Sequence, residues 1–152
     1  MSRESRYYRA HGIVLRTYKL GEADRIVVLL TAERGMVRAV AKGVRKTRSK
    51  FGSRLEPMSH VALQLHEGRS ELHLITQVES IDHFRPIRED LDRLAKGVSM
   101  LEAVDQVALP DEPVPELYRM LLGALRTLAA NDSALVTAGF FLKLLTLEGA
   151  GP

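Results

Sequence analysis

The chain has 152 residues, 45% of them apolar and 27% charged, a balance that is typical of globular proteins and excludes an intrinsically disordered chain. It contains no cysteine, which excludes disulfides, thiolate nucleophiles and cysteine-ligated zinc. The longest uninterrupted apolar run, residues 26–30, is far shorter than the roughly 20 residues of a membrane helix, and no apolar stretch follows the basic N-terminus, so we expect a cytoplasmic protein.

The net charge of +3 is distributed unevenly along the chain. Residues 1–56 contain 14 Lys or Arg and 5 Asp or Glu, a net charge of +9, whereas residues 57–152 contain 8 and 14, a net charge of −6. This asymmetry favours a basic surface for a polyanion in the first half of the chain and a different role for the second half.

Residues 1–80 show the two-residue apolar period of β-strands and no helical period. Their pattern predicts five strands, at residues 9–19, 25–31, 36–42, 58–66 and 71–80. The second has five consecutive apolar residues, which predicts burial on both faces. Val37, Ala39 and Ala41 of the third strand are predicted to face the core. Arg38 and Lys42 alternate with them and are predicted to face outward.

The fourth and fifth strands are predicted to form a hairpin around the turn at residues 67–70. The residues predicted to face the core are Val61, Leu63, Leu65, Leu72, Leu74 and Val78. The histidines between them, His60, His66 and His73, are predicted to face outward. Five short antiparallel strands in about 70 residues are typical of the partly open oligonucleotide-binding (OB) barrel, in which closure limits exposed edges.

From Ile87 onward the apolar period changes to three and four residues, which predicts an amphipathic helix that ends before Pro110. A second helix is predicted after Pro115, and a third over residues 134–147, with a capping segment at 131–133. The third helix is apolar nearly all round, so we expect the rest of the chain to cover it, with a partner protein as the alternative. The sequence therefore predicts an α+β fold, with an OB-type nucleic-acid-binding domain in residues 1–80 and an all-α domain in residues 81–152.

The most informative segment of the sequence is basic and lies around the end of the third predicted strand. Residues 34–55 contain no acidic residue, and the densest part, residues 42–54, reads KGVRKTRSKFGSR. Long cationic side chains in a glycine-containing loop suit a phosphate backbone, because neutralising phosphates releases counterions and needs no base-specific geometry. The predicted nucleic-acid-binding residues are Arg38, Lys42, Arg45, Lys46, Arg48, Lys50 and Arg54. The alternative is a solvated loop that only keeps the protein soluble.

Two aromatic residues near this segment, Tyr18 and Phe51, are predicted to stack on unpaired bases, although partial burial in the core is an equally good interpretation for both. Motifs of enzymes are absent from the sequence: it has no phosphate-binding glycine-lysine loop, no glycine-flanked serine and no helical histidine pair spaced for zinc. We therefore expect no catalytic residue, no metal and no cofactor.

Six short motifs follow one another between Gly12 and Pro57. They are IVLR at 13–16, GEAD at 21–24, the turn at 31–35, AKGVRK at 41–46, SKF at 49–51 and LEP at 55–57. Together they resemble the N-terminal domain of the RecO family of DNA repair and recombination mediators. The segment FFLKLLTLEGAGP at 140–152 is similar to the last helix of that family's helical domain, so the resemblance spans nearly the whole chain.

This resemblance implies an OB domain and a helical domain, binding of single- and double-stranded DNA, and annealing of complementary strands. It also implies help in loading the recombinase RecA onto strands coated with single-stranded DNA-binding protein, together with the partner RecR, and hence association with the nucleoid. Members of the family usually continue further, many with a four-cysteine zinc element; since this chain has no cysteine, zinc binding is not predicted. Two other functions stay open, a module that docks single-stranded DNA-binding protein or RecR, and an RNA-binding barrel.

Overall fold

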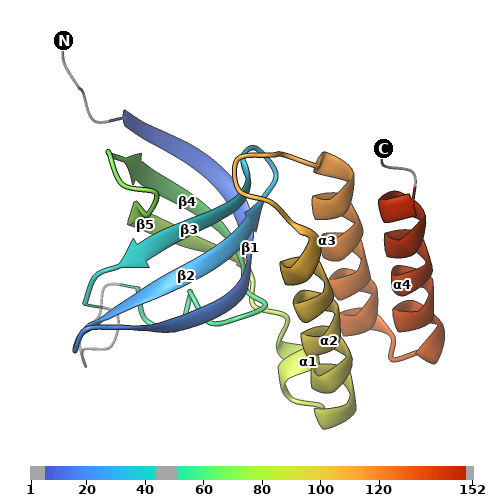
Figure 1. Ribbon diagram of the computed structural model, residues 1–152. Helices are drawn as coiled ribbons and strands as arrows, with labels where there is room; N and C mark the ends of the chain where they lie inside the picture. The colour runs from blue at the N-terminus through green and yellow to red at the C-terminus, as the bar shows by residue number, and fades with distance from the viewer. Residues whose placement is uncertain (1–5, 44–50, 150–152) are drawn as a thin grey trace.

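The structure is a computed structural model that describes residues 6–43 and 51–149, and within these ranges five strands precede four helices (Figure 1). The strands are β1 (Arg6–Leu20), β2 (Asp24–Thr31), β3 (Gly35–Ala41), β4 (His60–Glu67) and β5 (His73–Asp82). The helices are α1 (Arg85–Arg88), α2 (Leu91–Val107), α3 (Pro115–Ala130) and α4 (Ala134–Gly149). The predicted α+β fold, a small barrel followed by helices, is confirmed.

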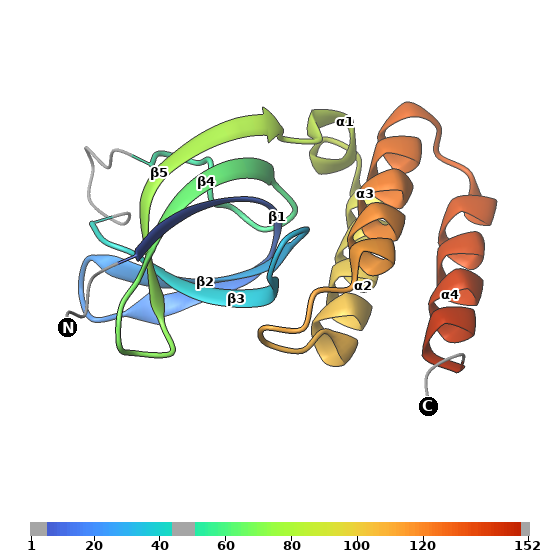
Figure 2. The same cartoon turned by 90° about the horizontal axis from the view of Figure 1, so that it is seen from above.

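The five strands close into a barrel in the order β1-β2-β3-β5-β4, and Figure 2 shows the ring from above. Four of the pairings are antiparallel, as predicted, but β3 and β5 run parallel, with Ala39 opposite His73. The structure differs from the prediction at this pair for a geometric reason. Strand directions cannot alternate all the way around a ring of five, so at least one neighbouring pair must be parallel.

Alternate residues of the strands fill the inside of the barrel, as the two-residue period predicts. Val37 of β3 and Val27 and Leu29 of β2 belong to this inner cluster. Phe51 and Leu55, from the segment between β3 and β4, belong to it as well, with exposed fractions of 1% and 4%. The chain that follows the basic residues is therefore anchored in the barrel core.

The alternation predicted for β5 holds only in part. Val78 packs against the inner cluster as predicted, but nearer the start of the strand it is Ile75, and not Leu74, that lies there. A register shift in the β4·β5 pairing leaves Thr76 as an extra residue between the paired positions. A bulge of this kind moves the side chains before it to the opposite face, and apolar periodicity alone does not reveal it.

Two of the three histidines predicted to face outward are buried, His60 with 4% and His73 with 7% of the residue exposed. The His60 Nε2 atom lies 2.6 Å from the hydroxyl oxygen of Tyr118 in α3, and His73 Nδ1 lies 2.6 Å from that of Tyr8 in β1. The prediction failed because each ring finds a hydrogen-bonding partner far away in the sequence, which lowers the cost of burying it.

The first predicted helix is divided in two. After the short α1, Asp90 adopts an extended backbone conformation, and its side chain accepts hydrogen bonds from the backbone N–H groups of Asp92 and Arg93 at the start of α2. A carboxylate that caps a helix in this way stabilises a new N-terminus, so the chain restarts its helix there. The helices predicted after Pro115 and from residue 134 are confirmed as α3 and α4.

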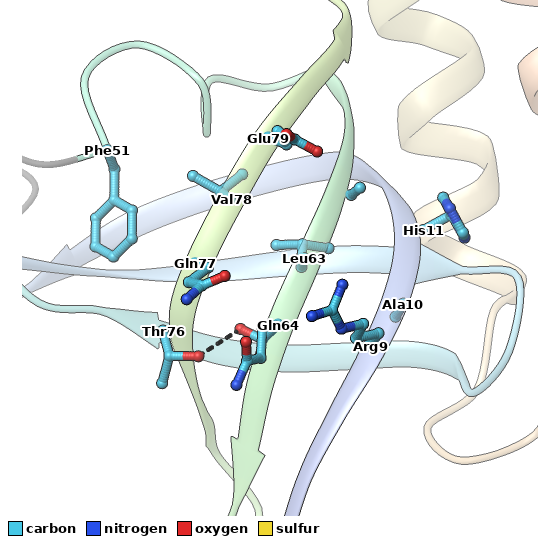
Figure 3. A pocket seen from close by; sticks show the side chains of 11 residues that line it. Arg9, Ala10, His11, Phe51, Leu63, Gln64, Thr76, Gln77, Val78 and Glu79 are labelled. Atoms are coloured by element: carbon cyan, nitrogen blue, oxygen red, sulfur yellow. Dashed lines mark hydrogen bonds between the residues drawn. The ribbon is translucent and has the colours of Figure 1, made fainter.

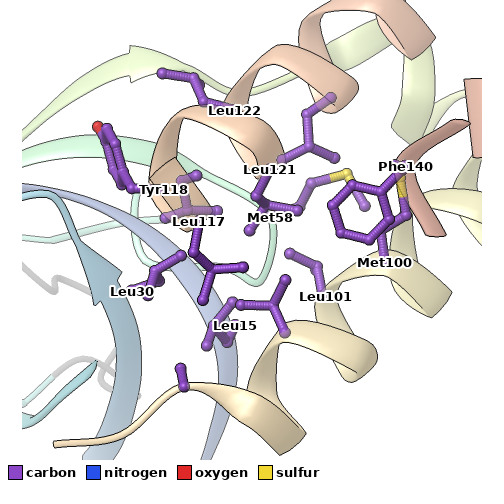
Figure 4. Close-up of a cluster of buried hydrophobic side chains, with 14 of the residues drawn as sticks. Leu15, Leu30, Met58, Met100, Leu101, Leu117, Tyr118, Leu121, Leu122 and Phe140 are labelled. Carbon is purple, nitrogen blue, oxygen red and sulfur yellow. The ribbon is translucent and has the colours of Figure 1, made fainter. Parts of the chain in front are cut away.

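The helices lie on one side of the barrel and share a second hydrophobic cluster with it (Figures 1 and 2). Leu15 and Leu30, on the outer faces of β1 and β2, pack there with Leu101 of α2 and Leu117 of α3 (Figure 4). Val28 belongs to the same cluster, so β2 is buried on both faces, as its uninterrupted apolar run predicted.

Helix α4 is the outermost helix, and it is covered on one face only (Figure 2). Phe140 and Leu144 are buried against the other helices, whereas Leu135, Leu142 and Leu145 are 79%, 66% and 69% exposed. The expectation that the rest of the chain covers this helix is therefore wrong for its outer face. Among the described residues, no helix is both long and apolar enough to cross a membrane.

Candidate nucleic-acid interface

The outer face of β1, β2 and β3 carries two rows of side chains that the pairing register brings side by side. Val28 pairs with Arg16 of β1 and with Arg38 of β3. In the neighbouring row, Ile26 of β2 pairs with Tyr18 of β1 and with Val40 of β3. Residues that are directly opposite in paired strands point to the same face, and Val28 faces the helices. Both rows therefore lie on the outside of the barrel.

Tyr18 lies between the two arginines of this face. The Arg38 guanidinium donates a hydrogen bond of 3.0 Å to the Tyr18 hydroxyl, and the central guanidinium carbon of Arg16 lies 5.4 Å from the centre of the Tyr18 ring. The hydrogen bond to Tyr18 raises the pKa of Arg38 above its ordinary value, so this exposed side chain keeps its positive charge. The two sequence predictions, a cation at 38 and an aromatic at 18, thus describe one cluster.

Arg16 was not predicted, and it carries a partner of its own. Its Nε atom donates a 2.7 Å hydrogen bond to a carboxylate oxygen of Asp105, on the C-terminal half of α2. The two side chains are 51% and 21% exposed. Arg16 ends the IVLR motif, and a bulge in β1 beside Val14 brings it onto the outer face. Strand periodicity alone therefore could not place it.

The basic segment leaves the barrel at the end of β3. Lys42 is exposed in the turn directly after β3, four residues beyond Arg38. The backbone N–H of Gly43 donates a 2.8 Å hydrogen bond to Asp24, which holds the start of the segment beside the turn between β1 and β2. Gly43 has a φ of 70°, a conformation that favours glycine. The predicted DNA-binding residues Arg45, Lys46, Arg48 and Lys50 lie outside the described residues.

The far end of the segment returns to the barrel with Phe51 and Arg54. Arg54 is exposed, in the turns that precede β4. Phe51 is only 1% exposed because its ring packs in the barrel core, so the structure does not offer it to a base. Of the two interpretations of Phe51, stacking on a base and burial in the core, the structure supports burial. Tyr18 is half-buried and packs against the hydrophobic cluster that the barrel shares with the helices.

Not every cation of the acid-free run belongs to this face. Arg34 forms ion pairs with Glu67 at 3.1 Å and with Asp111 at 3.7 Å, and its guanidinium lies 4.4 Å from the centre of the Tyr8 ring. These contacts hold the β2–β3 turn against β4 and against the loop between α2 and α3. Arg34 therefore has a structural role, although it is the first cation of the acid-free run.

A hollow with a volume of about 680 Å³ lies on another side of the barrel, over β1, β4 and β5 (Figure 3). Its polar lining is mixed: Arg9 and Glu79 carry opposite charges, and Gln64 and Gln77 are neutral. A phosphate backbone needs an excess of cations. This hollow lacks that excess, so the outer face of β1–β3 is the better candidate interface.

Comparison with known proteins agrees with the fold. Residues 1–84 match the family described as "Recombination protein O N terminal", and residues 88–152 match "Recombination protein O C terminal". A curated relative from Nocardioides sp. (strain ATCC BAA-499 / JS614), "DNA repair protein RecO", is 51% identical over 149 residues, which cover 95% of this chain. The chain spans 61% of the length of that relative. With both halves of the chain matched by the same family, it belongs to the RecO family.

Proposed function

We propose that this protein binds DNA strands as a non-catalytic mediator of DNA repair and recombination. The binding surface comprises the outer face of β1–β3, with Arg38 and Tyr18, and the basic segment from Lys42 to Arg54. The observation that carries the proposal is the continuity of these two parts: β3 presents Arg38 outward and then leads directly, through Lys42, into an acid-free segment.

Charge neutralisation is the physical basis of the proposed activity. Cations on one surface attract the phosphates of a strand, release its counterions and reduce the repulsion between two strands that are held together. The half-buried Tyr18 adds a stacking platform, which is sequence-tolerant because every base has a π-face. Both features favour binding without sequence preference and favour annealing of complementary strands. Binding of single-stranded and of double-stranded DNA is proposed on this basis.

The proposed partners are RecR, single-stranded DNA-binding protein and the recombinase RecA, as the resemblance of the sequence implies. The exposed leucines on the outer face of α4 give a specific reason to keep protein docking as a second candidate function. To test protein docking, one measures how wild type and Leu142→Lys bind a peptide from the acidic tail of single-stranded DNA-binding protein. The measurement needs physiological salt, because an anionic peptide also binds a basic protein non-specifically at low salt.

The main test is a titration of labelled single-stranded DNA at salt concentrations from about 50 to 200 mM. We expect log affinity to fall linearly with log salt. The triple variant Arg45→Gln, Lys46→Gln, Arg48→Gln removes three cations, so the slope should become shallower by about 2, at roughly 0.7 for each phosphate contact with a single strand. Adding Arg38→Gln to this variant should make the salt slope shallower again, by less than the change of the triple variant.

The matched control changes the net charge by the same amount on the helices, with Arg119→Gln, Arg126→Gln and Lys143→Gln. It should leave the slope nearly unchanged. Equal slopes for the two triple variants would contradict the proposed surface. Tighter binding to RNA than to DNA of the same sequence would favour the RNA-binding alternative.

A further inference from the structure

The proposed interface contains one cation whose charge is already neutralised within the protein. Arg16 lies in the same row as Arg38 on the outer face of the barrel, yet its Nε donates to Asp105 at 2.7 Å. Arg38 donates its hydrogen bond to an uncharged hydroxyl, and Glu71 acts on it only as a weaker influence than Tyr18. The two arginines therefore differ in what they can offer to a phosphate.

The carboxylate of Asp105 belongs to a well-anchored helix. Its neighbours Leu101 and Val104 on α2 are buried in the cluster shared with the barrel, with 2% and 0% exposed. The Asp105 side chain is only 21% exposed, against 51% for Arg16. A phosphate that bound the other N–H groups of Arg16 would meet a cation whose charge the adjacent carboxylate offsets. A phosphate that displaced the carboxylate would leave Asp105 partly desolvated without its cation, which is unfavourable.

We propose that Asp105 determines the binding strength of the nucleic-acid surface by neutralising Arg16 and withholding it from the phosphate backbone. This inference rests on the proposed function and deepens it. The ligand is an anionic strand, and α2 of the helical part supplies the opposing charge. A moderate affinity of this kind suits a protein that must hold two strands and then release the annealed product.

The test is a double-mutant cycle with oligothymidylate, monitored by fluorescence anisotropy across a salt series. Asp105→Asn keeps an oxygen that accepts from Arg16 and removes only the charge. We expect it to tighten binding several-fold at low salt and to make the salt slope steeper by about 0.7, the value of one additional phosphate contact. Arg16→Gln alone leaves the charge of Asp105 unbalanced and should weaken binding, and Arg16→Gln combined with Asp105→Asn should return the affinity to about the wild-type value.

The matched control is Glu102→Gln, which removes the same charge from an exposed position one turn earlier on α2. It corrects for the general effect of a more positive protein. An affinity gain in Asp105→Asn no larger than in Glu102→Gln would overturn the inference, and so would a gain that persists in the double variant. Weaker binding by Asp105→Asn would also overturn it and would make Asp105 a positioning residue.

The two levels of the proposal fail separately. If wild type binds the strand with a steep salt slope and Asp105→Asn behaves like its control, only the inference about Asp105 fails. If wild type does not bind the strand even at low salt, the proposed function fails and the inference fails with it. Circular dichroism of each variant verifies that the fold is retained.

Discussion

At the scale of single residues, His60 connects the barrel to the helices. His60 is the first residue of β4; its Nε2 atom lies 2.6 Å from the hydroxyl of Tyr118 in α3, and only 4% of the residue is exposed. Its Nδ1 atom has no hydrogen-bonding partner within the described part of the chain. Burial, reinforced by the positive charge of Arg126, lowers the pKa of His60 to about 4. The ring is therefore neutral in the folded protein at physiological pH.

This lowered pKa predicts a loss of stability in mild acid. Between the ordinary histidine pKa of about 6.5 and the folded value, the unfolded chain binds a proton that the folded chain does not, so the free energy of unfolding decreases as the pH falls through this window. The contribution of His60 should be on the order of 2 to 3 kcal/mol by pH 4. Urea unfolding at a series of pH values measures it.

The control for this prediction is His60→Gln, which keeps a polar side chain near Tyr118 and does not titrate. It should flatten the dependence of stability on pH between about 6.5 and 4 without abolishing it, because burial also lowers the pKa values of His73 and His83. An identical dependence in wild type and in His60→Gln would show that His60 does not carry the effect.

At the scale of elements, the junction between the β2–β3 turn and the α2–α3 loop is unusually close. Gly35 has a φ of 71°, and a Cβ built at this position would lie 2.5 Å from the backbone oxygen of Glu112. The same two segments are joined by the ion pair of Arg34 with Asp111 and by a hydrogen bond from Met36 N–H to the Leu109 carbonyl. The turn thus fixes where the loop crosses the barrel.

We therefore expect Gly35→Ala to destabilise the protein by about 2 to 4 kcal/mol, since alanine adds a backbone clash to the cost of a left-handed conformation. Gly21→Ala is the matched control: Gly21 has a φ of 63°, but a Cβ there would meet nothing within 4 Å. It should lower stability by only about 1 kcal/mol. Chemical denaturation of both variants compares them, and equal losses would show that the close approach is not important.

The helices and strands also show how far apolar periodicity can predict a fold. Periodicity located all five strands and the last two helices, because side-chain alternation and helical spacing are local properties of the sequence. It missed the restart of the helix at Asp90, which depends on a capping hydrogen bond, and the bulge in the β4·β5 hairpin, which depends on the partner strand. Both errors concern one or two residues, but the bulge exchanged Leu74 for Ile75 in the core.

At the scale of the whole molecule, the barrel and the helices share one hydrophobic cluster. Ile13, Leu15, Val28 and Leu30, on the outer side of the barrel, are at most 5% exposed because α2 and α3 cover them. Removing the helices would expose these side chains to water, and burial of each contributes about 1.5 to 3 kcal/mol. The barrel thus depends on the helices for much of its stability.

This predicts that a fragment of residues 1–84 does not behave as an independent monomer. We expect it to aggregate, or to unfold at a clearly lower urea concentration than the 152-residue chain, because it exposes a continuous apolar patch. Size-exclusion chromatography and circular dichroism are the measurements. A monomeric fragment with the unfolding midpoint of the intact chain would contradict the dependence. Replacing Leu15 and Leu30 in the fragment by Gln should reduce its aggregation.

The sequence alone was sufficient to predict the barrel, the last two helices and the polarity of charge along the chain, because composition and local periodicity encode these features. It also supplied the cations of the proposed interface as a prediction. The tertiary structure decided which charges remain available. It paired Arg16 with Asp105 and Arg34 with Glu67, buried His60 beside Tyr118 and placed Phe51 inside the barrel. These outcomes depend on groups that lie far apart in the sequence but only a few ångströms apart in space. Electrostatic and burial free energies depend on the spatial distance between groups and not on their separation in the sequence.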